Sequence, residues 1–180
     1  FAGRDRLLAT QEWYRTQPDP TGSDTWMLDL RSGKVIEPPA AFSRFSDAAF
    51  SDDGRIAVLR DADGAVQAWQ VDPWRPLSPR ITPRTAASAE PIPWMLSADG
   101  RHAFALVDDQ RAVEVYATAG MRLVRRYQPQ PRTRISAWAV DPANALLALG
   151  DGEGRLRLVE LAGGAARLLP TARGERISWI

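Results

Sequence analysis

The chain has 180 residues, the length of one ordinary domain or of a repeat array with a handful of units. Its 23 Lys and Arg residues balance 22 Asp and Glu residues, so charge gives it no general reason to bind nucleic acid or an acidic membrane surface. The absence of cysteine and the single histidine exclude disulfides, thiolate zinc sites, cysteine nucleophiles and sites that need two imidazoles.

No apolar run approaches the roughly 20 residues that span a bilayer, and no leader with a charged and then an apolar part opens the chain. The sequence starts at Phe1 rather than Met, which we interpret as processing or as excision from a longer protein. Both a cytoplasmic and a periplasmic location stay open. Lys34 is the only lysine, a bias typical of GC-rich, bacterial genomes.

Residues 1–44 form the first and faintest of four similar units. Residues 1–9 align with residues 50–58, and residues 25–28 align with residues 66–69. Between these two matches lies a loop that is longer than its counterparts. We therefore expect the chain to begin within the first strand of this unit.

Residues 45–88 form the second and clearest unit. Strands are expected near 46–51, 55–60 and 65–71, because each stretch is rich in apolar residues and ends at Gly, Pro or Asp. A tight Asp/Gly turn separates the second strand from the third, which is typical of a β-hairpin.

The third unit, residues 89–131, and the fourth, residues 132–172, repeat this order. Their strands are expected near 92–97, 101–107, 112–117, 135–140, 145–150 and 155–161. The equivalent positions Phe50, Leu96 and Val140 are 46 and 44 residues apart. Residues 173–180 repeat the start of the fourth unit, so they begin a further unit or close the first one.

This period predicts an all-β fold. Units of about 45 residues with four short strands are typical of β-propeller blades. No stretch of ten or more residues shows helical spacing without a Gly or Pro. We expect a β-propeller-like array of about four four-stranded blades.

The second unit resembles a WD-repeat blade in residues 50–55 and 63–69. Asp63 stands six residues before Trp69, where that family keeps a structural turn Asp. Gln110 and Glu153 stand at this position in the next units, and no Gly-His pair precedes any unit, so the resemblance is to a degenerate member. Residues 28–35 are more similar to quinoprotein-type propellers. Because WD-like propellers have roughly six to eight blades, we expect the four units to be part of a larger propeller.

The resemblance implies that the turns after the second strands share one face with the loops between units. The turns are acidic, with Asp61, Asp63, Asp108, Asp109, Asp151 and Glu153. The loops are basic, with Arg84, Arg132, Arg134, Arg173 and Arg176. We predict a charged surface that binds a polar or zwitterionic partner such as a peptide. The alternative is that Asp and Gly form tight turns and Arg keeps the loops soluble.

Tryptophan is the second candidate feature. Trp74 lies between two prolines and next to Arg75, so it is either an interface anchor on a loop or folds back on its own unit. Trp94, Trp138 and Trp179 hold related positions in first strands. They either pack between blades or line a central channel.

No catalytic, cofactor or metal site is expected. The acidic stretches at 61–64 and 151–154 are too short to supply a calcium loop. The Gly-rich stretch at 150–154 lacks the Lys-Ser/Thr ending of a phosphate loop. His102 lies in a strand with no nucleophile motif around it.

The leading hypothesis is therefore a non-catalytic scaffold that binds a protein or peptide. One alternative is a ligand-sensing or cofactor-bearing quinoprotein-like propeller, which a chromophore in the absorption spectrum would identify. Another is the extracytoplasmic insert of a membrane transporter or receptor. Self-association of the units is a further possibility, and fold resemblance does not choose among these.

Overall fold

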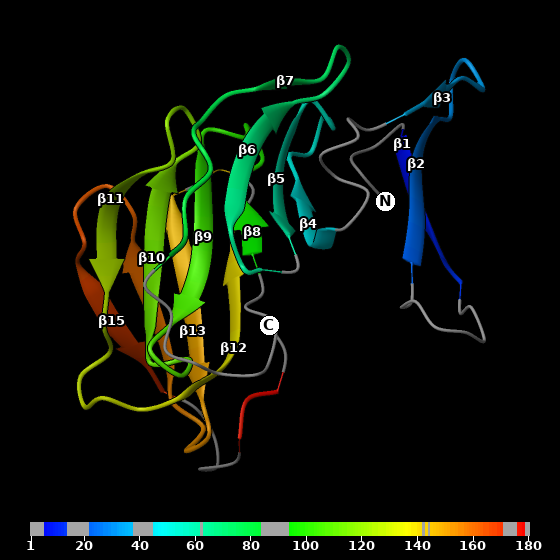
Figure 1. Ribbon diagram of the computed structural model, residues 1–180. Coiled ribbons are helices and arrows are strands. Elements are labelled where there is room, and N and C mark those ends of the chain that lie inside the picture. Colours follow the sequence, from blue (N-terminus) through cyan, green and yellow to red (C-terminus); the bar gives the residue numbers. More distant parts are fainter. Residues whose placement is uncertain are drawn as a thin grey trace.

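The computed structural model describes residues 6–13, 22–37, 45–61, 63–83, 94–141, 143, 145–170 and 176–178. These residues form fifteen strands and no helix (Figure 1). Accordingly, no helix in this part of the chain is long and apolar enough to cross a membrane. The expected all-β class is confirmed.

The strands form four separate antiparallel sheets, which we call blades 1 to 4 in chain order. Blade 1 has three strands, β1 (Arg6–Trp13), β2 (Gly22–Asp29) and β3 (Val35–Ile36). Blade 2 has β4 (Phe45–Phe50), β5 (Ile56–Asp61), β6 (Val66–Gln70) and β7 (Arg75–Pro76). Blade 3 has β8 (Trp94–Leu96), β9 (His102–Val107), β10 (Ala112–Ala117) and β11 (Arg122–Tyr127). Blade 4 has β12 (Ile135–Val140), β13 (Leu146–Asp151), β14 (Leu156–Glu160) and β15 (Ala166–Leu169).

Each four-stranded blade is a simple meander in which every strand pairs with the next one along the chain. The nine strands expected between residues 46 and 161 all form, each within two residues of the expected bounds. Blade 1 differs from the expected four strands, because the described residues supply it with three.

The turn between the first and second strands is built in the same way in blades 2 and 3. In blade 2, the buried Ser51 hydroxyl donates to Asp53 and accepts the N–H of Ile56. Ser97, at the equivalent place in blade 3, makes the same bonds to Asp99 and His102. These serines close a turn whose glycine has a positive φ, the conformation that glycine adopts most readily.

Alternate residues of each blade face opposite neighbours, so the core consists of three layers between blades. Met27, Leu59 and Trp69 belong to the layer between blades 1 and 2. Val58 and Ala68 face blade 3 and belong to the layer between blades 2 and 3, which also contains Tyr116. The third layer, between blades 3 and 4, contains Phe104, Val113, Trp138, Leu147, Leu149 and Val159.

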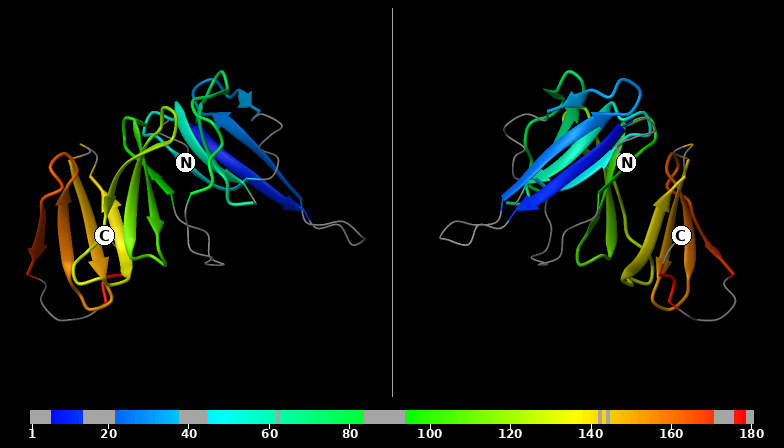
Figure 2. Two further views of the ribbon diagram at one scale, coloured as in Figure 1. Left: turned by 60° about the vertical axis from the view of Figure 1, so that its left-hand side comes forward. Right: turned by 90° about the vertical axis from the view of Figure 1, so that its right-hand side faces the viewer.

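The blades follow one another along an arc, with blade 1 at one end and blade 4 at the other (Figure 2). In both views of Figure 2 the two end blades lie apart.

Candidate functional site

The turns that connect second and third strands lie at the same end of each blade as the linkers to the next blade, because the strands alternate in direction. Six acidic residues of these turns contact or adjoin arginines from the same blade or the following linker. We call this set the rim: Asp61, Asp63, Arg80, Asp108, Asp109, Arg126, Arg132, Asp151, Glu153, Arg155 and Arg157.

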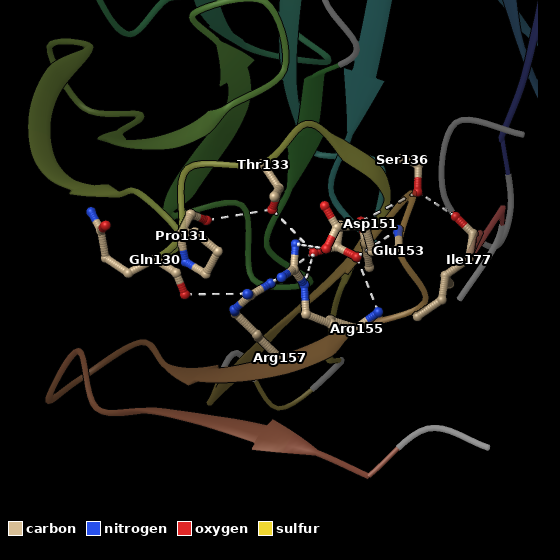
Figure 3. Close-up of polar contacts among 10 residues, drawn as sticks. Gln130, Pro131, Thr133, Ser136, Asp151, Glu153, Arg155, Arg157 and Ile177 are labelled. Carbon is tan, nitrogen blue, oxygen red and sulfur yellow. Dashed lines mark hydrogen bonds and ion pairs between the residues drawn. The ribbon is translucent and has the colours of Figure 1, made fainter. Parts of the chain in front are cut away.

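Asp151 is the centre of the rim in blade 4 (Figure 3). Its Oδ1 accepts the backbone N–H groups of Glu153 and Arg155, each at 3.0 Å, which closes the β13–β14 turn. Its Oδ2 accepts Arg155 Nε at 2.8 Å, Thr133 Oγ1 at 3.0 Å and Arg157 Nη1 at 3.2 Å. Asp151 therefore joins the turn, the third strand and the linker that precedes the blade.

The carboxylate of Asp151 is buried, with 2% of the side chain exposed. Burial opposes its charge, but hydrogen bonds from Arg155, from Arg157 and from the turn outweigh this and lower its pKa below the ordinary range. Arg157 is also buried and reaches the carbonyl of Gln130 through Nη2 at 3.2 Å. Both carboxylate oxygens of the buried Asp151–Arg157 pair accept hydrogen bonds, as a buried charge requires.

Blade 3 uses a different set of partners for its turn. Asp108 accepts hydrogen bonds from Arg126 and from Arg132, the latter at 3.1 Å. Arg126 also donates to the buried Glu114 at 2.9 Å, and Glu114 accepts the hydroxyl of Tyr116. Burial, followed by the contact with Glu114, raises the pKa of Tyr116 well above its ordinary value.

Blade 2 repeats the turn chemistry of blade 4. Asp61 Oδ1 accepts the N–H groups of Asp63 and Ala65, each at 3.0 Å. Arg80 forms ion pairs with Asp61 and, at 3.3 Å, with Asp63. The structural carboxylate of this turn is thus Asp61 and not Asp63, which the family resemblance favoured.

Asp151 likewise closes the turn in blade 4, and Glu153, which stands at the position of the family's turn Asp, does not. Asp63 and Glu153 point outward, with 87% and 65% of their side chains exposed. The reason is geometric: the residue that leaves the second strand can reach back to the N–H groups of the turn, whereas the residue at its tip cannot.

The other predicted site residues lie in different places. Arg134 and Arg176 are exposed, while Arg84, Arg173 and Trp179 are outside the described residues. Trp74 lies in the β6–β7 turn, at the opposite end of blade 2 from the rim, with its ring centroid 6.4 Å from that of Trp69. The structure therefore does not bring Trp74 together with the charged residues.

Trp94 and Trp138 are buried, at 7% and 9% exposure, and belong to the layers between blades. This agrees with packing rather than with the lining of a channel.

Sequence reasoning missed the arginines that neutralise the turns, namely Arg80, Arg126, Arg155 and Arg157. One signal was present for Arg157: it stands two residues before Val159, so both side chains lie on the same face of the strand, and Val159 packs in the layer between blades 3 and 4. A charged residue at such a position requires a buried partner.

Within the described residues, no group of three or more acidic or histidine side chains is placed to hold a metal ion. No protein-family model matches the chain, and none of the curated proteins is significantly similar to it. The rim therefore has to be interpreted from its own geometry. It offers fixed donors and acceptors of both charges along one end of the blades.

Proposed function

We propose that the chain is a non-catalytic scaffold that binds a protein or peptide through the rim, as part of a WD-like β-propeller. One observation supports this most: the exposed charges of the rim are anchored by internal contacts. Arg132, half exposed, is held by Asp108, and the exposed Glu153 is held by Arg155 at 2.7 Å.

Anchored side chains favour binding because less conformational entropy is lost when a partner arrives. The rim alternates acidic tips with arginines, so the partner that fits it carries both charges. Complementary charges of this kind determine register and association rate more than affinity. A segment of alternating acidic and basic residues is the simplest such partner.

The test is an array of synthetic peptides in which Glu and Arg alternate with different spacings, beside uncharged peptides of equal length. The wild-type chain is expected to prefer one spacing of the charged series. The variant Asp63→Lys/Glu153→Lys is expected to lose at least about tenfold in affinity for that peptide.

The matched control is Asp52→Lys/Glu160→Lys, which changes the net charge equally but at the opposite end of blades 2 and 4. It is expected to bind as the wild type does. Equal loss in both double variants, or no preference for charged peptides, would contradict the proposal.

A further inference from the structure

The outer face of blade 4 is apolar and only half-buried. In blade 3 the residues that point toward the next blade are Phe104, Leu106, Val113 and Val115, none more than 6% exposed. The equivalent residues of blade 4 are Ala148, Gly150, Leu156 and Leu158. Apart from Gly150, these are half-buried, as is Leu146 on the same face. We call Leu146, Ala148, Leu156 and Leu158 the tail face.

Ile177, in the stretch that repeats the start of the fourth unit, already sits at the edge of the tail face. Ile177 donates its N–H to the carbonyl of Asp151 at 3.2 Å, as Ile135 does to Gln110 at 2.7 Å where blade 4 begins. Its carbonyl accepts Ser136 Oγ at 2.5 Å (Figure 3).

The Ile177 side chain also packs flat on the backbone of Gly150. A Cβ at Gly150 would lie 2.7 Å from Cγ2 of Ile177, closer than side-chain contacts allow. Ile177 thus occupies, relative to blade 4, the place that Ile135 occupies relative to blade 3. It marks where the innermost strand of a covering blade starts.

Blade 1 has the features that such a covering blade needs. Strand β1 corresponds to the second strand of the other blades, because residues 1–9 align with residues 50–58. In those blades the second strand pairs on both sides, whereas the outer side of β1 has no partner among the described residues. Met27 is fully buried toward blade 2. The side chains Trp26 and Leu28 flank it on the opposite face and are half-buried, as is Leu7, which pairs with Leu28. We call Leu7, Trp26 and Leu28 the head face.

We propose that the tail face of one molecule binds the head face of a second copy of the chain, and that Ile177 and Ser178 lie along the unpaired edge of β1 in that copy. Blades 4 and 1, which carry the tail face and the head face, lie at opposite ends of the arc (Figure 2). A second copy satisfies both, because each molecule supplies one tail face and one head face. Two copies then close around a two-fold axis and leave no large apolar face exposed. This inference rests on the end faces and is independent of the rim.

The test measures the mass of the 180-residue chain by light scattering. The wild type is expected at twice 19.9 kDa. Leu158→Asp, on the tail face, and Leu28→Asp, on the head face, are each expected to give the monomer mass. Leu168→Asp is the matched control, because Leu168 is 59% exposed on the outermost strand of blade 4 and lies outside the tail face. It is expected to remain a dimer.

Mixing the two monomeric variants distinguishes the mode of association. Leu158→Asp keeps its head face and Leu28→Asp keeps its tail face, so a head-to-tail contact restores a dimer in the mixture. Contact between two tail faces would not restore a dimer in the mixture, because one of the two variants has an altered tail face. Circular dichroism establishes that each variant is folded, and if one is not, the other carries the test.

A monomeric wild type would overturn the proposal, whether the faces close within one chain or stay exposed. So would a dimer that survives both Leu158→Asp and Leu28→Asp, or a mixture that stays monomeric.

Discussion

At the scale of single residues, the turn carboxylates of the rim are paired with arginines of the same blade or of the linker that follows it. The carboxylates at the ends of β5, β9 and β13 are Asp61, Asp108 and Asp151, and each contacts an arginine. Only Asp151 is fully buried together with one of its arginines, Arg157. Stability therefore depends more on Asp151 than on the outward-facing acidic residues.

Asp151→Ala is expected to lower the free energy of unfolding by about 3–5 kcal/mol, because it leaves Arg157 buried without its counter-charge and removes the bonds that close the turn. Urea denaturation measures the effect. Glu153→Ala, two residues away, serves as the control and is expected to cost less than about 1 kcal/mol, since 65% of that side chain is exposed. Equal costs would mean that the Asp151 network contributes nothing beyond surface charge.

The pH dependence follows from the same carboxylate. Its pKa is lowered in the folded state, so the unfolded chain binds a proton more readily than the folded one. The stabilisation is complete above the unfolded value of about 3.9 and is lost as the pH falls toward the folded pKa. Asp151→Asn is expected to show a smaller drop in unfolding free energy between pH 7 and pH 3 than the wild type. An unchanged drop would assign the acid sensitivity to other groups.

At the scale of elements, the β9–β10 turn stands out because three successive residues without glycine have positive φ. Asp108, Asp109 and Gln110 have φ values of 53°, 54° and 61°. Side chains disfavour this region by roughly 1–2 kcal/mol per residue. The two arginines on Asp108 and the bond from Ile135 N–H to the Gln110 carbonyl hold the turn in place.

Gln110→Gly is expected to stabilise the chain by about 0.5–1 kcal/mol, because glycine relieves the strain and keeps the backbone carbonyl that binds Ile135. The control is Gln128→Gly, at an exposed position outside the positive-φ region, where the added freedom of the unfolded chain is expected to cost about 0.5–1 kcal/mol. Thermal unfolding compares the two, and a loss in both would show that the turn is unstrained.

Strand positions could be predicted from sequence because each depends on local patterns. Apolar stretches and the Asp/Gly turns between them are short-range signals that bound β5, β6, β13 and β14. The choice between Asp61 and Asp63 as the turn carboxylate could not be predicted from the sequence, because both residues are acidic and only the backbone geometry distinguishes them. The arginine partners could not be predicted either, because 17 to 19 residues of chain, with at least one whole strand, separate Arg80 and Arg126 from their carboxylates.

At the scale of the whole molecule, each blade is stabilised by its immediate neighbours. Blade 3 is covered by a blade on both faces, whereas within the described part of the chain blade 4 is covered by another blade only on the face toward blade 3. In arrays of this kind stability is approximately a sum of the units and the contacts between neighbours. An end blade is therefore expected to open more readily than an inner one.

Strands β10 and β14 allow a direct comparison of the two blades. Both are third strands, and both are hydrogen-bonded to a strand on each side. They differ in burial: five of six residues of β10 are buried, whereas Leu156 and Leu158 of β14 are half-buried. Any difference in their opening thus reports the missing cover and not the number of backbone hydrogen bonds.

Hydrogen exchange of the native protein measures this opening. At dilutions where light scattering gives the monomer mass, the amides of β14 are expected to exchange at least about tenfold faster than those of β10, because they open with the end blade and not only with global unfolding. At concentrations where the tail face is covered, the β14 amides are expected to slow while those of β10 change less. Equal exchange of the two strands in the monomer would show that the four blades unfold as one unit and that an exposed face does not weaken the blade that carries it.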